Sequence, residues 1–215
     1  MPFPDAATFV LFLVAALALL VVPGPAVVYI VAQSIDQGRV AGLVSTLGIG
    51  VGSLVHVAAA AIGLSSLLVS SAEAYAVVKY AGAAYLVFLG VRRLLGRDEP
   101  PGSEVGARKP LSRLFRQGII VNVLNPKTAL FFFAFLPQFV DVDAGAVGFQ
   151  IAVLGLIFVL LGLASDGTYA LVAGTLSGWL RGNTRVLRVQ RYLSGTVFVG
   201  LGLATALSGS QRKNS

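Results

Sequence analysis

Long uncharged runs separated by short charged segments dominate this chain. The five longest runs cover residues 6–35, 40–72, 117–140, 144–180 and 192–211. Only Lys127 and Asp166 carry a formal charge inside them. A helix needs about 20 apolar residues to cross the hydrocarbon core of a bilayer, and every run reaches that length. The pattern therefore predicts an all-α, polytopic membrane protein.

A shorter apolar run between Lys79 and Arg92 predicts one further span. It becomes long enough if the helix begins near Ala74 and the Lys79 side chain extends toward the membrane surface. We therefore expect six transmembrane helices, with five as the alternative.

The distribution of basic residues predicts the orientation in the membrane. With six spans and the N-terminus outside, twelve Lys and Arg residues fall in cytoplasmic segments and three in external ones. Cytoplasmic loops are enriched in these residues. Both termini are therefore expected outside, whereas five spans would place the C-terminus on the other side.

A segment rich in Pro, Gly and charge, residues 96–112, divides the chain almost in half. It predicts a cytoplasmic linker between two three-helix units, residues 1–95 and 113–215. Because three is odd, the two units would be inverted repeats. Residues 80–90 and 192–202 share Tyr, Val, Leu and Gly at aligned positions, a weak trace of such a repeat.

Prolines interrupt the predicted helices 1 and 4, at Pro23-Gly24-Pro25 and at Asn125-Pro126. A proline lacks the backbone N–H, but it can begin a new helical segment, which Asn125 could cap. Broken helices at matching places in two repeats are typical of transporter binding sites, and their N-termini suit a carboxylate. The alternative is a simple proline kink.

The missing N–H groups should free the carbonyls of Leu19, Val21 and Asn122. Asn122 lies one turn before Asn125. We interpret it either as a substrate-binding residue or as a group that satisfies the freed backbone.

Lys127, Asp166 and His56 are the titratable candidates for function within the predicted spans. A charge at membrane depth is costly and indicates function, so Lys127 is a candidate substrate ligand; snorkelling or a structural pair with Asp166 is the alternative. Asp166 shares a helical face with Gly155 and Gly162. It is a candidate for substrate binding or proton coupling, against a structural hydrogen bond or ion pair. His56 is a candidate proton relay, although a core hydrogen bond is the favoured interpretation.

Several functions are excluded by what the sequence lacks. The chain has no cysteine and one histidine, so neither a thiol-redox centre nor a metal site is expected. Its net charge of +7 comes from short basic clusters between apolar runs, which argues against nucleic-acid binding. No nucleotide-binding loop or catalytic set is found, so we expect no enzyme and no cofactor.

These motifs resemble the LysE/RhtB family of bacterial amino-acid exporters over roughly residues 8–207. The matching elements are PGPA at 23–26, Gln37-Gly38 with Gly42, the glycine-spaced helix with His56, YAGAAYLVFLG at 80–90, FRQGIIVNVLNPKTALFFFAFLPQF at 115–139 and SGTVFVGLGL at 194–203. The resemblance implies proton-driven secondary efflux of amino acids such as lysine, homoserine or threonine across the bacterial cytoplasmic (inner) membrane. It also implies two inverted three-helix repeats. Asp166 matches no motif of the family.

Residues and resemblance together predict export of an amino acid by alternating access around a midplane site. The substrate carboxylate is expected near Gly24-Pro25 and Asn125-Pro126-Lys127, and its ammonium near Asp166 or the freed carbonyls. A proton entering from outside would reset the carrier. A membrane-embedded enzyme, a non-transport assembly protein and a cation exporter are the alternatives. The identity of the substrate stays open, and a homo-oligomer is compatible with the sequence.

Overall fold

The computed structural model describes residues 4–64 and 109–177 continuously, with single positions between 77 and 95 and between 192 and 203. All regular structure among these residues is helical: six α-helices with short π- and 3-10-helical segments. The predicted spans 74–91 and 192–211 and residues 96–108 of the predicted linker lie outside the continuously described residues. The six α-helices are therefore not the six predicted spans.

The first apolar run forms a broken helix, as the prolines predict. Its two parts are α1 (Ala6–Val21) and α2 (Pro25–Gln37), which meet at an angle of 49°. Asp5 caps α1 by accepting hydrogen bonds from the backbone N–H groups of Ala7 and Thr8, at 2.9 and 3.1 Å. The Thr8 hydroxyl also donates to this carboxylate, and together these bonds hold the pKa of Asp5 below its usual value.

The run from 117 to 140 is also broken. In chain order its elements are α6 (Leu111–Val123), α7 (Pro126–Leu130), the π-helical η2 (Phe131–Phe135) and the 3-10-helical η3 (Leu136–Phe139). The bend at the break is 47°. Asn125 is the N-cap of α7, as predicted, because its side-chain oxygen accepts from the Lys127 N–H at 3.1 Å.

Two continuous helices complete the described part of the chain. They are α3 (Arg39–Ala59), extended by the π-helical η1 (Ala60–Leu64), and α8 (Val147–Thr175). Both are long and apolar enough to cross a membrane, and each broken pair passes the same test when it is taken as one span. The described residues thus contain up to four spans, and six spans for the whole chain stay a prediction.

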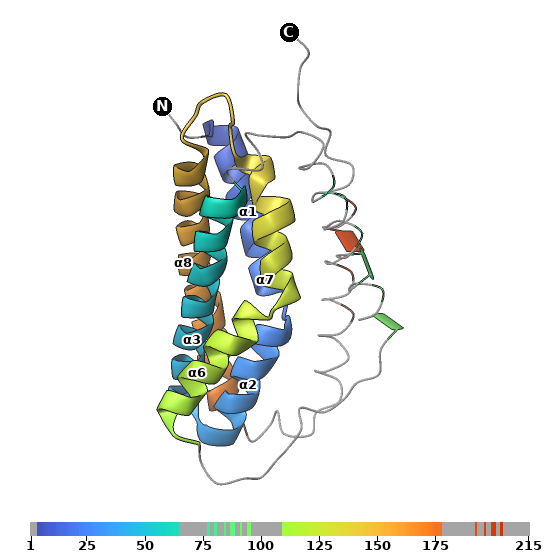
Figure 1. The fold of residues 1–215 in the computed structure, drawn as a ribbon. Helices are drawn as coiled ribbons and strands as arrows, with labels where there is room; N and C mark the ends of the chain where they lie inside the picture. The colour runs from blue at the N-terminus through green and yellow to red at the C-terminus, as the bar shows by residue number, and fades with distance from the viewer. Residues whose placement is uncertain are drawn as a thin grey trace.

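Helix α3 lies at the centre of the described bundle, against α2, α6 and α8 (Figure 1). Its crossing with α6 depends on glycines. A Cβ atom on Gly48 would lie 2.2 Å from the Phe115 carbonyl oxygen, and one on Gly118 would lie 2.7 Å from the Ser45 carbonyl oxygen. Small residues permit such close backbone approach between membrane helices.

Two apolar clusters of different size lie on either side of the helix breaks. The larger one is rich in aromatic side chains and includes Phe12, Phe131, Phe132, Phe135, Phe139 and Phe158. The rings of Phe131 and Phe158 stack with centroids 3.8 Å apart. The smaller cluster consists of Ala26, Ile30, Ile49 and Ala170. The breaks therefore lie between a thick aromatic layer and a thin aliphatic one.

The two ends of the bundle differ in charge. The junction of α2 and α3 and the beginning of α6 lie at one end in Figure 1. These segments carry every described basic residue apart from Lys127, namely Arg39, Lys109, Arg113 and Arg116, together with Asp36. Asp5 and the 141–146 loop, with Asp141 and Asp143, lie at the other end. The remaining basic residues that were counted for the orientation lie outside the described residues.

Candidate functional site

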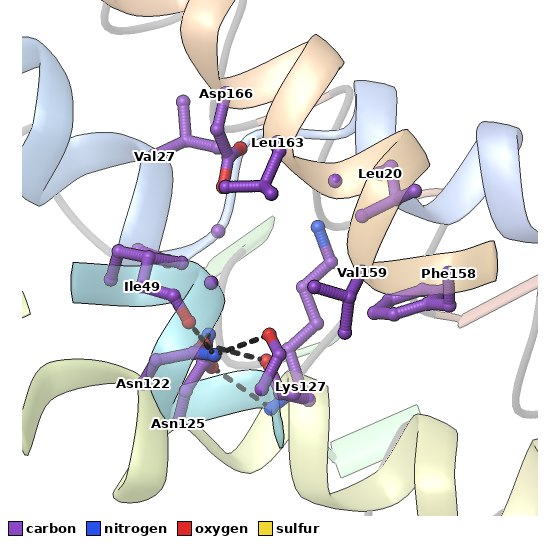
Figure 2. Close-up of a pocket in the computed structure, with 16 residues that line it drawn as sticks. Leu20, Val27, Ile49, Asn122, Asn125, Lys127, Phe158, Val159, Leu163 and Asp166 are labelled. Carbon is purple, nitrogen blue, oxygen red and sulfur yellow. Dashed lines mark hydrogen bonds between the residues drawn. The ribbon is translucent and has the colours of Figure 1, made fainter. Parts of the chain in front are cut away.

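A small cavity lies where the two helix breaks meet α3 and α8 (Figure 2). Its volume is about 40 Å³. A water molecule needs roughly 10–15 Å³ of such volume, so the cavity has room for water but not for an amino acid. In this conformation the described residues therefore leave no room for an amino acid in the cavity.

Five of the nine site residues predicted from the sequence line the cavity. They are Gly24, Asn122, Asn125, Lys127 and Asp166. The three prolines, Pro23, Pro25 and Pro126, shape the breaks beside it without lining it, and His56 does not line it either. The sequence interpretation thus identified residues from α6, α7, α8 and the first break that fold into one place.

Lys127 joins the two breaks. Its side chain is 7% exposed, and its ammonium group donates a hydrogen bond to the carbonyl of Val22, in the first break. A Cβ atom on Gly24 would lie 2.9 Å from the Lys127 Cδ, so the glycine makes room for the aliphatic part of the lysine. The ammonium is directed into the cavity (Figure 2).

Asp166 brings a carboxylate to the same cavity from α8. It is also 7% exposed, and it makes no hydrogen bond with any described residue. Its negative charge interacts with the positive charge of Lys127 across the cavity. Among the described residues no three His, Asp or Glu side chains gather as they would around a metal ion. The charged chemistry of the lining is therefore one ammonium and one carboxylate.

Asn122 is the centre of a hydrogen-bond network beneath this charged pair. Its amide nitrogen donates to the Ile49 carbonyl at 2.8 Å and to the Ser53 hydroxyl at 2.7 Å. Its amide oxygen accepts from the Asn125 amide at 3.2 Å and from the Thr128 hydroxyl at 2.9 Å. These four bonds use the full capacity of an asparagine side chain. The network therefore fixes α3, α6 and α7 relative to one another.

His56 contacts the same network from outside the cavity. Its Nε2 lies 3.0 Å from the carbonyl oxygen of Asn122. Pro126 offers this carbonyl no N–H, but the oxygen also accepts from the Asn125 N–H at 3.0 Å. Because the acceptor is a carbonyl, Nε2 must carry the proton. The ring also stacks on Phe132, with centroids 6.0 Å apart. This geometry is that of the core hydrogen bond favoured in the sequence interpretation.

Three polar residues near the cavity were not predicted as site residues. Ser53 and Thr128 line it, and the Tyr169 hydroxyl donates to the Val21 carbonyl at 2.6 Å. The Val21 carbonyl is one of those expected to be freed by a proline. Helical spacing was the available signal, since Tyr169 lies three residues after Asp166.

The two breaks differ in what they offer a ligand. At the first break the earliest helical bond of α2 runs from Val28 N–H to Gly24 O, so the N–H groups of Ala26 and Val27 have no partner within the helix. Both residues line the cavity. At the second break Asn125 already satisfies the Lys127 N–H. At the second break the earliest helical bond of α7 runs from Ala129 N–H to Asn125 O, so only the Thr128 N–H has no partner within the helix. Of these two breaks, both described, the first therefore presents two such N–H groups and the second presents one.

Comparison with known proteins supports a common ancestry over most of the chain. Residues 17–209 match the family model of the LysE type translocators. A membrane protein of Pseudomonas aeruginosa, described as uncharacterized, is 30% identical, with 87% of this chain and 90% of that one covered.

Two other relatives have names that describe transport. The leucine efflux protein of Klebsiella pneumoniae is 26% identical, with 89% of this chain and 91% of that one covered. The homoserine/homoserine lactone efflux protein of Salmonella typhimurium is 27% identical, with 86% and 88% covered. No solved structure gives a significant match. The chain belongs to the LysE type translocator family and is a membrane transport protein rather than an enzyme.

Proposed function

We propose that this protein exports amino acids or closely related small metabolites from the cytoplasm, coupled to protons. The observation that carries the proposal is a buried cavity lined by one ammonium, of Lys127, and one carboxylate, of Asp166. An amino acid is a zwitterion, so it presents one complementary group to each of them. A ligand with a single charge would leave one of these side chains unmatched, which is costly in a buried site.

The substrate carboxylate would bind Lys127 and the free N–H groups at the beginning of α2. Helix N-termini favour anions because their N–H groups and the helix dipole point at the ligand. The substrate ammonium would face Asp166. Asn125 would hold Lys127 in place through the cap of α7, and Asn122 would hold Asn125. Pro23, Pro25 and Pro126 would contribute by keeping the helices broken.

The names of the relatives support amino acids as the substrate class. The proteins from Klebsiella and Salmonella are named for leucine efflux and for homoserine and homoserine lactone efflux. At 26% and 27% identity they support the class of substrate and not one particular member.

Alternating access between two inverted three-helix repeats is the mechanism that suits this site. Bends of 49° and 47° at proline breaks in two spans support it, because such breaks recur at corresponding places in inverted repeats. The basic end of the bundle would face the cytoplasm of a bacterial inner membrane, with both termini outside. The aromatic layer would then close the site toward the outside, and the thin aliphatic cluster toward the cytoplasm.

Exchange in proteoliposomes tests the proposal. Vesicles containing the purified protein are loaded with a mixture of unlabelled amino acids, and entry of labelled amino acids is followed one at a time. We expect at least one to exchange faster than in protein-free vesicles, and an imposed pH gradient to drive its accumulation. A protein that is folded and inserted but exchanges no amino acid, or that moves only an inorganic cation, would contradict the proposal.

A further inference from the structure

The cavity has an apolar wall that the zwitterion-binding groups do not account for. This wall is formed by Leu20, Val27, Ile49, Phe158, Val159 and Leu163. In the view of Figure 2, Leu20, Phe158 and Val159 lie on the other side of the Lys127 ammonium from Asp166. A substrate that places its two α-groups on the charged pair must direct its side chain toward apolar surface.

The polar side chains of the described lining are already engaged with one another. Asn122 has no remaining hydrogen-bond capacity, and Ser53, Asn125 and Thr128 each bond to it. The lining contains no third charged residue among the described positions. A substrate with a charged side chain would therefore bury a charge without a counter-charge, and that is strongly unfavourable.

Gly162, on α8, leaves unfilled space in this apolar wall because it has no side chain. A Cβ atom at this position would lie 3.4 Å from Leu20 Cδ2 and would meet no other atom within 4 Å outside its own helix. The neighbouring Gly50 is different, because its Cβ would lie 2.7 Å from Leu163 Cδ2. The space that a side chain would occupy is therefore open at Gly162, whereas at Gly50 the Leu163 side chain already occupies it.

We infer that the carrier is selective for amino acids with an uncharged, aliphatic side chain, and that this side chain lies against Gly162. The inference rests on the proposed function, because it assigns the two charged groups of the cavity to the α-carboxylate and α-ammonium of the substrate. The cavity is water-sized in this conformation, so the helices must separate for loading. The side chains that α1, α2, α3 and α8 contribute to this wall are apolar whichever of these helices moves.

Alanine substitution at two glycines of α8 tests this inference. Gly162→Ala adds one methyl group to the apolar wall at ordinary contact distance, so the protein should fold. Gly167→Ala is the matched control: it is the same change on the same helix, its Cβ would lie 4.0 Å from Leu43 Cδ2, and it does not line the cavity. Both variants and the wild type are measured in proteoliposomes by exchange of labelled leucine and labelled alanine, with unlabelled lysine and glutamate as competitors.

We expect the wild type to exchange leucine and alanine, with little competition from lysine or glutamate. In Gly162→Ala the ratio of leucine to alanine exchange should fall about tenfold, since a methylene in an apolar pocket discriminates by roughly 10–200-fold. Gly167→Ala should keep the wild-type ratio. Effective exchange of lysine or glutamate, or an unchanged ratio in Gly162→Ala, overturns this inference and leaves the amino-acid exporter standing. Absence of exchange for every amino acid overturns both.

Discussion

The ammonium of Lys127 has a partner before any substrate arrives. It donates to the Val22 carbonyl, so a lysine on α7 holds the break that follows α1. In the proposed mechanism, a substrate carboxylate must compete with this neutral carbonyl for the ammonium. The carboxylate carries a full negative charge where the carbonyl carries only a dipole, so its Coulomb attraction to the ammonium is stronger and the exchange of partners favours the substrate. Substrate binding would then release one broken helix from the other.

Removal of the Lys127 ammonium should abolish this step. We expect Lys127→Ala to insert normally but to lower amino-acid exchange by about 10–100-fold, which is the loss of a charged hydrogen bond in a buried site. Lys127→Arg should also be poor, because a planar guanidinium replaces a compact charge. Exchange is measured in proteoliposomes with equal amounts of inserted protein. Wild-type exchange by Lys127→Ala would show that the lysine is structural and that the site is misplaced.

The side-chain amide of Asn122 makes all the hydrogen bonds it can, so we predict that this residue holds the helices around the cavity in place and does not bind the substrate directly. Asn122→Ala would remove four hydrogen bonds between three helices, so we expect the free energy of unfolding to fall by about 1–3 kcal/mol. Thermal melting in detergent measures the loss. Thr168→Ala is the control, because the hydroxyl of Thr168 makes one exposed local bond, to Ala164. An unchanged melting temperature for Asn122→Ala would instead favour a direct role as substrate ligand.

The sequence was sufficient to predict features that depend only on neighbouring residues in the chain. A proline breaks its own helix and an asparagine caps the next one, so the breaks and the Asn125 cap are confirmed where they were expected. The side chains that bond to the carbonyls of Val21 and Asn122 could not be predicted, because Tyr169 and His56 reach them from segments far away in the chain. Asn122 was ambiguous for the same reason: its bonds to α3 depend on how the helices cross.

At the scale of elements, glycines on a helix allow close packing, and the structure shows which neighbours pack against them. Gly48 and Gly52 of α3 pack against α6, and Gly155 packs against Phe132 and Val57. Sequence spacing identifies a face that permits close approach, whereas the choice of neighbour depends on the whole bundle. The π-helical segments η1 and η2 were not predicted, since no proline or glycine pattern specifies them.

The glycine contact between α3 and α6 predicts a strong effect of one methyl group. A Cβ atom at Gly118 would lie 2.7 Å from the Ser45 carbonyl oxygen and 3.2 Å from the Gly48 Cα, so two backbones would have to separate. We expect Gly118→Ala to lower the free energy of unfolding by about 1–3 kcal/mol. The matched control is Gly63→Ala, where the new Cβ has nothing within 4 Å. Equal melting temperatures for the two variants would contradict this packing argument.

On the scale of the whole molecule, the cavity lies between two apolar clusters of unequal size among the described residues. Large aromatic side chains from α1, η2, η3 and α8 pack on one side of it, while the cluster on the other side consists of Ala26, Ile30, Ile49 and Ala170, with Tyr29 and Val121 against them. Separation of the aliphatic side exposes less apolar surface and so costs less free energy. If the basic end faces the cytoplasm, the cytoplasmic side is the one that opens more easily. Such a difference would favour an exporter, because its substrate must enter the cavity from the cytoplasm.

In the proposed mechanism, coupling of transport to protons depends on Asp166, the carboxylate that faces the cavity without a hydrogen bond from the described residues. A proton and a substrate ammonium cannot both neutralise it, so each would displace the other, as antiport requires. Asn keeps the shape and an acceptor oxygen but cannot take up a proton. We therefore expect Asp166→Asn to retain amino-acid exchange, with weaker affinity, and to lose accumulation driven by an imposed pH gradient.

The control for this prediction is Asp36→Asn, which removes an exposed carboxylate from α2 at the basic end and should leave accumulation intact. Both variants are compared with the wild type in the same proteoliposomes, first without and then with the gradient. If Asp166→Asn still accumulates substrate, Asp166 is not the proton carrier, and His56 becomes the next residue to test. If exchange is lost together with accumulation, binding of a labelled amino acid to inserted protein separates the two remaining roles. Absent binding then assigns Asp166 to the substrate site, and intact binding assigns it to the conformational change that carries the substrate across.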